Sequence, residues 1–177
     1  MTRLDRRQFS AALAAGVLGA PWVAQAAAEP ALPDLGAAPE FTGLGKWFNS
    51  PPLTMAGLRG KVVLVDFWTF GCFNCANTMP HVVRWHDQFS RQGLVIVGIH
   101  TPEFGYEKQA ANVRTALGRF VIRIPVAQDN DFATWRAWRN QYWPAFYLVD
   151  QAGRVRRRHF GEGEYAQMEQ AIRTLLA

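Results

Sequence analysis

The chain has 177 residues, 49% of them hydrophobic and 19% charged, with 19 basic and 14 acidic side chains. A chain of this length corresponds to one domain that can bury a core of its own. The basic excess is small, so the charge gives no reason to expect nucleic acid as a partner.

The first 26 residues have the pattern of an export signal. Arg6 and Arg7 are followed by an uncharged, alanine-rich stretch from residue 8 to residue 28. An arginine pair before a moderately hydrophobic core is typical of the twin-arginine type of signal peptide. We therefore expect residues 1–26 to direct export to the periplasm. No stable membrane anchor is expected, because Pro21 and two glycines interrupt a run of barely sufficient length.

Residues 27–39 are rich in alanine, proline and glycine and show no periodicity, which predicts an extended, mobile linker. The folded domain is therefore expected to cover residues 40–177. Its first twenty residues contain glycines and a proline pair, with Trp47 and Phe48 between them. This composition predicts a short hairpin or cap that packs against the rest of the domain.

A short apolar run, Val62–Val65, precedes the two cysteines of the chain, Cys72 and Cys75. The run is rich in β-branched residues and predicts a strand buried on both faces. A glycine breaks the chain before Cys72, and a helical pattern follows it. The cysteines are therefore expected in the first helical turn, where residues three apart lie on one face and a disulfide can form.

The start of a helix favours a reactive cysteine, because its free N–H groups and dipole stabilise a thiolate. We expect Cys72 to be the exposed, attacking sulfur. Cys75, one turn further on, is expected to be covered and to resolve the mixed disulfide that Cys72 forms with a partner. Asp66 lies at the buried end of the preceding strand, so its pKa should rise and it could exchange a proton with Cys75.

Other interpretations of these residues remain open. A CxxC pair can be half of a zinc site, although the chain contains no second CxxC and only histidines could complete the site. The pair could also be a purely structural disulfide, but closing so short a loop stabilises a fold little. Asp66 could be a polar strand-end residue with a hydrogen-bond partner.

The rest of the chain alternates predicted helices and strands. A strand, a helix and a second strand within about forty residues indicate a right-handed parallel unit. We expect helices over 75–89, 106–117 and 164–176, the first of them kinked at Pro80. A further helix, capped by Asp129, is expected to carry Trp135 and Trp138. Further strands are expected over 94–99, 122–127, 145–149 and 155–160.

His100 and Glu103 follow the strand at 94–99. The carboxyl ends of neighbouring parallel strands share one edge of a sheet, and ligands bind at that edge in open α/β folds. Both residues are therefore candidates for the rim of a site around Cys72. The alternative is that His100 is a satisfied strand-end residue and that Glu103 caps the next helix.

Four stretches, FWTFGCFNC, GIHTPEF, NQYWPAFYLVD and HFGEG, give the chain a clear resemblance. From about residue 40 it resembles exported thioredoxin-like domains of the TlpA and DipZ kind. The resemblance implies an α/β thioredoxin fold, in which a central mixed sheet is flanked by helices after a short N-terminal extension. It also implies that Cys72 and Cys75 form the redox pair, that Asp66 is the buried acid and that no cofactor is needed.

The same resemblance implies a substrate groove beside Cys72. In thioredoxin-like folds a proline at the position of Pro144 is cis, and the backbone of the preceding residue, here Trp143, can pair with a substrate segment. We expect these two residues, together with Phe73, Asn74 and Glu103, to contact the substrate. Phe73 and Asn74 replace the Gly-Pro pair of thioredoxin, so thioredoxin's redox potential cannot be carried over.

The expected function is therefore a periplasmic thiol:disulfide oxidoreductase. The resemblance favours the reducing direction, with protein disulfides as clients and a membrane thiol-electron transporter as the reductant. Two alternatives are kept. One is an antioxidant thiol peroxidase, because Thr69 and Cys72 match the T-x-x-C core of peroxiredoxins. The other is a copper or zinc chaperone that uses the CxxC pair and a histidine.

Overall fold

The structure of the protein is a computed structural model, and the residues that it describes are 31–177. The expected signal peptide, residues 1–26, lies outside the described residues. Within residues 31–177, no helix is long and apolar enough to cross a membrane.

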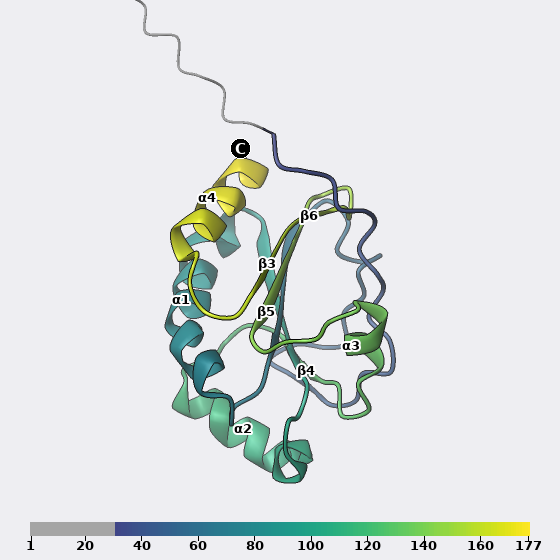
Figure 1. The fold of residues 1–177 in the computed structure, drawn as a ribbon, viewed down its shortest axis with the longest axis vertical. Coiled ribbons are helices and arrows are strands. Elements are labelled where there is room, and N and C mark those ends of the chain that lie inside the picture. The colour runs from purple at the N-terminus through teal and green to yellow at the C-terminus, as the bar shows by residue number, and fades with distance from the viewer. Residues whose placement is uncertain (1–30) are drawn as a thin grey trace, which may run out of the picture. The chain divides into compact units, whose positions relative to one another are not determined.

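A six-stranded mixed sheet forms the centre of the described part (Figure 1). The strands lie in the order β1-β4-β3-β2-β5-β6, and only the β2–β3 and β3–β4 pairs are parallel. The expected parallel unit and the expected hairpin of the last two strands are both confirmed. The strands are β1 (Trp47–Phe48), β2 (Val62–Trp68), β3 (Leu94–His100), β4 (Val126–Gln128), β5 (Ala145–Val149) and β6 (Val155–Phe160).

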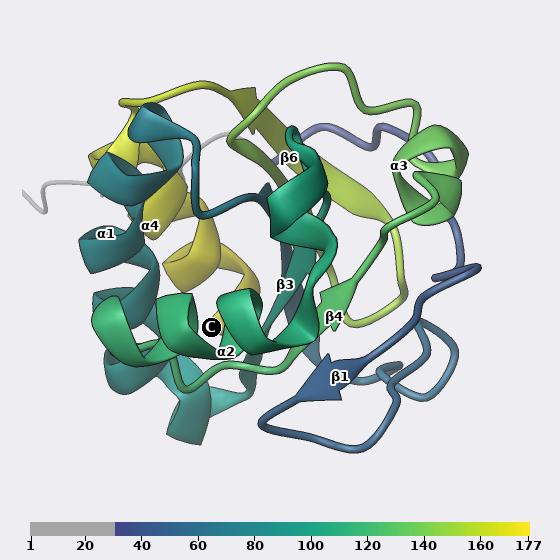
Figure 2. The same cartoon turned by 90° about the horizontal axis from the view of Figure 1, so that it is seen from below.

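Helices cover both faces of this sheet, which confirms the predicted thioredoxin-like architecture. Figures 1 and 2 show α1 and α4 on one side and α3 on the other. The helices are α1 (Phe73–Phe89), α2 (Ala110–Arg119), α3 (Ala133–Ala137) and α4 (Tyr165–Leu176), with 3-10 turns at η1 (Ser90–Gln92) and η2 (Gly105–Lys108).

The central strand β2 divides the core into two layers. Its residues are all buried, and successive side chains point to opposite faces of the sheet. Leu64 and Trp68 pack in the layer that contains residues of α1, α2 and α4, whereas Val65 and Phe67 pack in the layer that contains Trp138. Asp66 shares the period of Leu64 and Trp68, so it lies on the α1 side.

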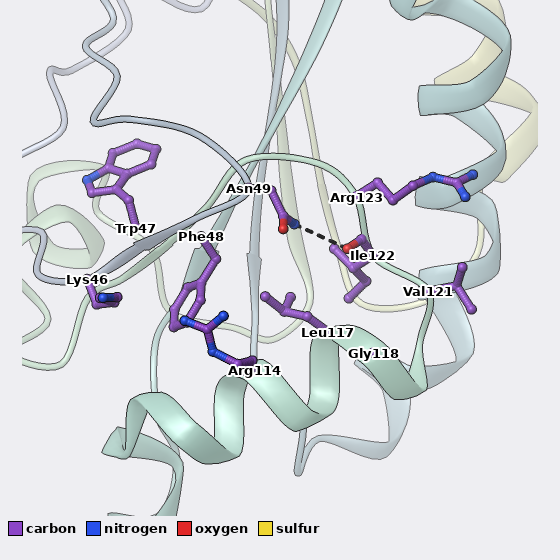
Figure 3. A pocket seen from close by; sticks show the side chains of 10 residues that line it. All are labelled: Lys46, Trp47, Phe48, Asn49, Arg114, Leu117, Gly118, Val121, Ile122 and Arg123. Atoms are coloured by element: carbon purple, nitrogen blue, oxygen red, sulfur yellow. Dashed lines mark hydrogen bonds between the residues drawn. The ribbon is translucent and has the colours of Figure 1, made fainter.

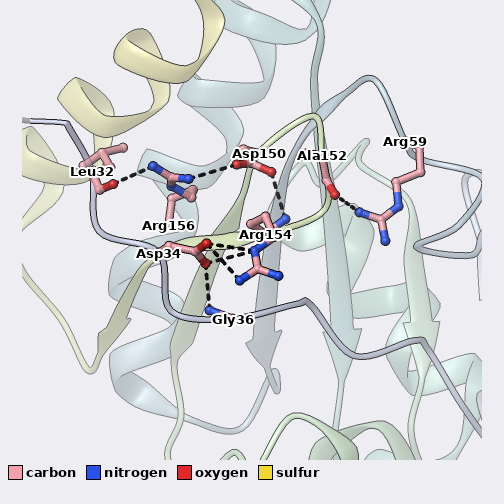
Figure 4. Close-up of polar contacts among 8 residues, drawn as sticks. All are labelled: Leu32, Asp34, Gly36, Arg59, Asp150, Ala152, Arg154 and Arg156. Carbon is pink, nitrogen blue, oxygen red and sulfur yellow. Dashed lines mark hydrogen bonds and ion pairs between the residues drawn. The ribbon is translucent and has the colours of Figure 1, made fainter.

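The segment from residue 31 to residue 39 is held on the domain, which corrects the expectation of a mobile linker there (Figure 4). The Leu35 N–H donates to the Val155 carbonyl at 2.8 Å, and the Asp34 carboxylate pairs with Arg154. Arg156 donates to the Leu32 carbonyl at 2.6 Å. These contacts join the segment to the start of β6, which is more than a hundred residues away.

Residues 40–60 contain one short edge strand, β1, and no hairpin. The segment packs on the domain as the expected cap, because Phe41, Met55 and Leu58 are buried in its core. β1 pairs antiparallel with β4, and Phe48 is buried. The Asn49 amide group donates to the carbonyls of Ile122 (3.2 Å) and Ile124 (2.9 Å), and Figure 3 shows the first of these bonds. A cavity of about 510 Å³ lies between this strand and α2, and neither cysteine lines it.

Most predicted elements differ from the structure by only one or two residues at an end, but two differ more. The strand expected at 122–127 is only β4, because Asn49 takes the carbonyls of Ile122 and Ile124 and because Pro125 has no N–H. The helix expected at 106–117 is broken into η2 and α2, and it continues through Gly118. The break lies at Gln109, whose backbone is extended (φ −78°, ψ 121°).

Candidate active site

The two cysteines lie at the start of α1, as the spacing predicted. Cys72 is the N-cap residue, and its sulfur accepts the N–H of Cys75 at 3.2 Å. Cys75 is completely buried, whereas Cys72 is partly exposed, and both are free thiols. Cys72 is therefore accessible from the surface, and Cys75 is covered.

The surroundings of Cys72 favour its thiolate. The hydrogen bond from the Cys75 thiol is the largest cause, and backbone N–H groups of Cys75 and Asn74 add to it, so that the pKa of Cys72 falls to about 7. Burial and the charge of Glu103 act in the opposite direction. Burial raises the pKa of Cys75, so that thiol keeps its proton at neutral pH. The site thus combines a nucleophile with a protonated reserve thiol.

Asp66 is buried beneath this pair. Burial, with a smaller contribution from the charge of Cys72, raises the pKa of the Asp66 carboxyl to about 8. Neither carboxyl oxygen has a hydrogen-bond partner among residues 31–177. The Asp66 charge in turn helps to raise the pKa of Cys75. An isolated carboxyl of this kind, coupled to a thiol, is suited to exchange a proton with it.

His100 and Glu103 lie in different surroundings. His100 is buried, and its Nε2 lies 3.2 Å from Thr69 Oγ1. Burial lowers the pKa of His100 to about 4, so the ring is neutral. His100 is therefore a buried strand-end residue and does not belong to the rim. Its Nε2 has a partner, whereas its Nδ1 has none among residues 31–177. Glu103 is exposed, and its charge acts on Cys72, which places it on the rim.

The Trp143–Pro144 peptide bond is cis, as the resemblance implied. The Trp143 indole N–H donates to the Thr101 carbonyl at 3.1 Å, and its ring packs against Trp135 with centroids 4.3 Å apart. Pro144 is buried and Trp143 is half-buried, so Trp143 is the more accessible of the two.

Phe73 and Asn74 are exposed on the first turn of α1, and the Phe73 side chain is 76% exposed. Exposed aromatic side chains also lie nearby on the rim, where the rings of Phe104 and Tyr106 stack with centroids 5.8 Å apart. Of the residues expected to contact a substrate, Phe73 and Asn74 at the start of α1 and Glu103 on the loop after β3 are thus exposed.

Sequence reasoning missed one residue of this site, Glu107. It is completely buried, and its carboxylate accepts the N–H groups of Gly71 (2.7 Å), Glu103 (2.6 Å) and Phe104 (2.8 Å). The residue lies in a stretch that reads as an exposed amphipathic helix. The glycine immediately before Cys72 was the one available indication that a side chain approaches closely there.

Within residues 31–177, no three histidine, cysteine or acidic side chains are grouped in a way that could hold a metal ion. Fold and site together define a thioredoxin-like protein of the thiol:disulfide oxidoreductase class.

Comparison with known proteins agrees with this class. The model of the AhpC/TSA family matches residues 36–158, and the chain belongs to that family. The chain is 45% identical to Protein DipZ of Mycobacterium tuberculosis (strain CDC 1551 / Oshkosh) over 148 residues, and this match covers 82% of the chain. The match spans only 21% of the DipZ chain.

Two further proteins match over nearly their whole length. The thiol-disulfide oxidoreductase YkuV of Bacillus subtilis (strain 168) is 28% identical over 139 residues, which are 78% of this chain and 93% of YkuV. The crystal structure of the thioredoxin-like superfamily protein SPOA0173 superposes with a TM-score of 0.74 at 29% identity, covering 80% of this chain and 97% of that one.

Proposed function

We propose that the protein reduces disulfide bonds of client proteins in the periplasm. The observation that carries this proposal is the pairing of a partly exposed Cys72 of lowered pKa with a buried, protonated Cys75 and the isolated carboxyl of Asp66. This arrangement supplies an attacking thiolate, a second thiol to complete the exchange and a group that can take its proton.

The reaction has two steps. The Cys72 thiolate attacks one sulfur of a client disulfide, which forms a mixed disulfide and releases the other client sulfur as a thiolate. The mixed disulfide removes the Cys72 charge that adds to burial in raising the Asp66 pKa to about 8, so a larger fraction of Asp66 is ionised. Cys75 then gives its proton to this carboxylate and attacks the Cys72 sulfur, which releases the second client thiolate. Two electrons pass to the client, and Cys72 and Cys75 become a disulfide.

The proposed direction, location and electron donor rest on features of the sequence. The resemblance to exported thioredoxin-like domains favours the reducing direction, and residues 1–26 have the pattern of a twin-arginine signal. The oxidised pair must then be reduced again in a compartment without the cytosolic thiol pool. A membrane thiol-electron transporter is the expected source of these electrons.

The reduction potential of the Cys72–Cys75 pair tests the direction. Equilibration with dithiothreitol or glutathione should give a low value, near the roughly −270 mV of thioredoxin. A value near roughly −120 mV would make the protein a disulfide donor and would reverse the proposed direction. A pair that forms no disulfide would remove exchange altogether. Titration of the reduced protein with copper or zinc would then test the metal-chaperone alternative.

Because the chain belongs to the AhpC/TSA family, a thiol peroxidase remains the alternative function to be tested. In the structure, however, Thr69 of the T-x-x-C stretch is buried and its hydroxyl lies against His100. A threonine that served peroxide would have to face the space in front of Cys72. Consumption of hydrogen peroxide by the reduced protein, at a rate equal to or above that of client disulfide reduction, would favour the peroxidase.

Replacing Glu103 with glutamine should lower the pKa of Cys72, because the Glu103 charge opposes the thiolate. We expect a shift of about a few tenths of a unit at low salt, since the carboxylate is exposed and screened. The rate of iodoacetamide alkylation as a function of pH measures it. Glu169→Gln, on α4, is the charge-matched control. It should leave the profile unchanged, because Glu169 pairs with Arg84 and Arg173 and is not among the groups that act on Cys72.

A further inference from the structure

We propose that Glu107 is a positioning residue that clasps the turn before Cys72 to the loop after β3, and that this clasp keeps the Cys72 sulfur in contact with the start of α1. The inference rests on the proposed role of Cys72 as the nucleophile. Glu107 itself touches no reacting atom.

The clasp joins two segments that are distant in the sequence. One carboxylate oxygen, Oε1, accepts the Gly71 N–H, and the other, Oε2, accepts those of Glu103 and Phe104. All three distances lie between 2.6 and 2.8 Å, the short range typical of hydrogen bonds to a charged acceptor. Because the carboxylate is completely buried, water does not compete for these donors.

Gly71 is the residue that makes the clasp possible. A Cβ atom at this position would lie 2.4 Å from Glu107 Oε1 and 2.9 Å from the Tyr106 hydroxyl. Real Cβ atoms do not approach other atoms so closely, so any side chain here would displace the carboxylate. Glycine is therefore required here by the close approach of Glu107.

The clasp acts on Cys72 through its neighbour. Gly71 directly precedes Cys72. The Cys72 Sγ lies 3.2 Å from the Cys75 nitrogen, and it must keep this hydrogen bond for the start of α1 to stabilise its thiolate. The other groups that influence this sulfur are the Cys75 thiol, the Asn74 N–H and the Glu103 carboxylate, and Asp66 lies behind the pair. Glu103 is itself fixed by the clasp, so its distance from Cys72 also depends on Glu107.

The direction in which the Cys72 pKa changes in Glu107→Gln distinguishes a positioning role of Glu107 from a purely electrostatic one. Glu107→Gln removes a negative charge, which by itself would favour the Cys72 thiolate and lower its pKa. It also weakens the clasp, because the amide keeps one acceptor oxygen where the carboxylate had two. Loss of positioning would reduce the contact between the sulfur and the Cys75 N–H, and the pKa of Cys72 would rise.

The experiment measures the alkylation rate of Cys72 against pH in the full chain, with thermal unfolding recorded in parallel. Glu107→Gln should raise the Cys72 pKa and slow alkylation at pH 7 by about threefold to tenfold. Gly71→Ala, which changes no charge, should act in the same direction. Glu103→Gln, as predicted above, should act in the opposite one. A Cys72 pKa that is unchanged or lowered in the folded Glu107 and Gly71 variants would overturn the proposal.

The wild-type protein offers a test that does not depend on whether the variants fold. The N–H groups of Gly71, Glu103 and Phe104 belong to exposed residues, yet the clasp should slow their hydrogen exchange. Exchange at the rate of an open loop would refute the clasp. Both measurements need no client protein, so a failure of disulfide reduction would count against the proposed function and leave this inference standing.

Discussion

Cys72→Ser should abolish the reduction of client disulfides, with a loss of at least about a thousandfold, because a serine hydroxyl has neither the acidity nor the nucleophilicity of this thiol. Cys75→Ser should fail at a different step. Cys72 would still attack, but no second thiol would release the client, so a mixed disulfide should accumulate. The difference follows from the exposed position of Cys72 and the complete burial of Cys75.

The two variants are compared with an oxidised client protein under non-reducing conditions. Cys75→Ser should form a covalent adduct with the client, and dithiothreitol should cleave it by reducing the mixed disulfide. Cys72→Ser should form no adduct. The double variant is the control for nonspecific association. Adduct formation by Cys72→Ser would mean that the buried thiol reaches clients, and turnover by Cys75→Ser at the wild-type rate would remove its resolving role.

The parts of the site that sequence alone predicts are those built from local contacts. β2, the turn and the first helical turn of α1 follow one another between Val62 and Cys75, and their apolar run, glycine and cysteine spacing determine the geometry. The burial of Asp66 follows from its place in a strand that is covered on both faces. The sequence therefore predicted a raised pKa for this carboxyl, and the structure confirms it.

The parts that were missed depend on contacts between distant residues. Glu107 is buried because Gly71, 36 residues earlier, leaves space for its carboxylate. Periodicity cannot reveal such an arrangement, so this stretch reads as an ordinary helix. The position of the segment at 31–39 was missed for the same reason, because its partners Val155 and Arg154 lie more than a hundred residues away in the sequence. Composition predicted a linker there, although backbone pairing to β6 holds the segment in place.

Asp66→Asn should remove a dependence of stability on pH that the wild-type protein shows. The folded-state pKa of Asp66 is about 8, whereas an unfolded aspartate titrates near about 4. Between these values the folded protein holds a proton that the unfolded chain has lost, so stability falls as the pH rises through this window. The full effect is on the order of several kcal/mol, reached above the folded-state pKa.

Urea unfolding of both proteins at pH 5 and at pH 8 measures this difference. The asparagine side chain remains buried without a partner at every pH, so the change in stability between the two pH values is the informative quantity. The wild-type protein should lose more stability than Asp66→Asn over this interval. An equal loss in both would mean that the carboxyl is not held protonated.

The same variant should slow the second step of the reaction. Without a carboxyl to accept its proton, Cys75 should resolve a preformed mixed disulfide more slowly, by about tenfold or more. The initial attack by Cys72 should change little, because Asp66 is buried behind the cysteine pair. Stopped-flow measurement of both steps separates them. A variant that loses the pH dependence of stability but keeps the wild-type rate of resolution would show that Asp66 is a polar strand-end residue and not the proton acceptor.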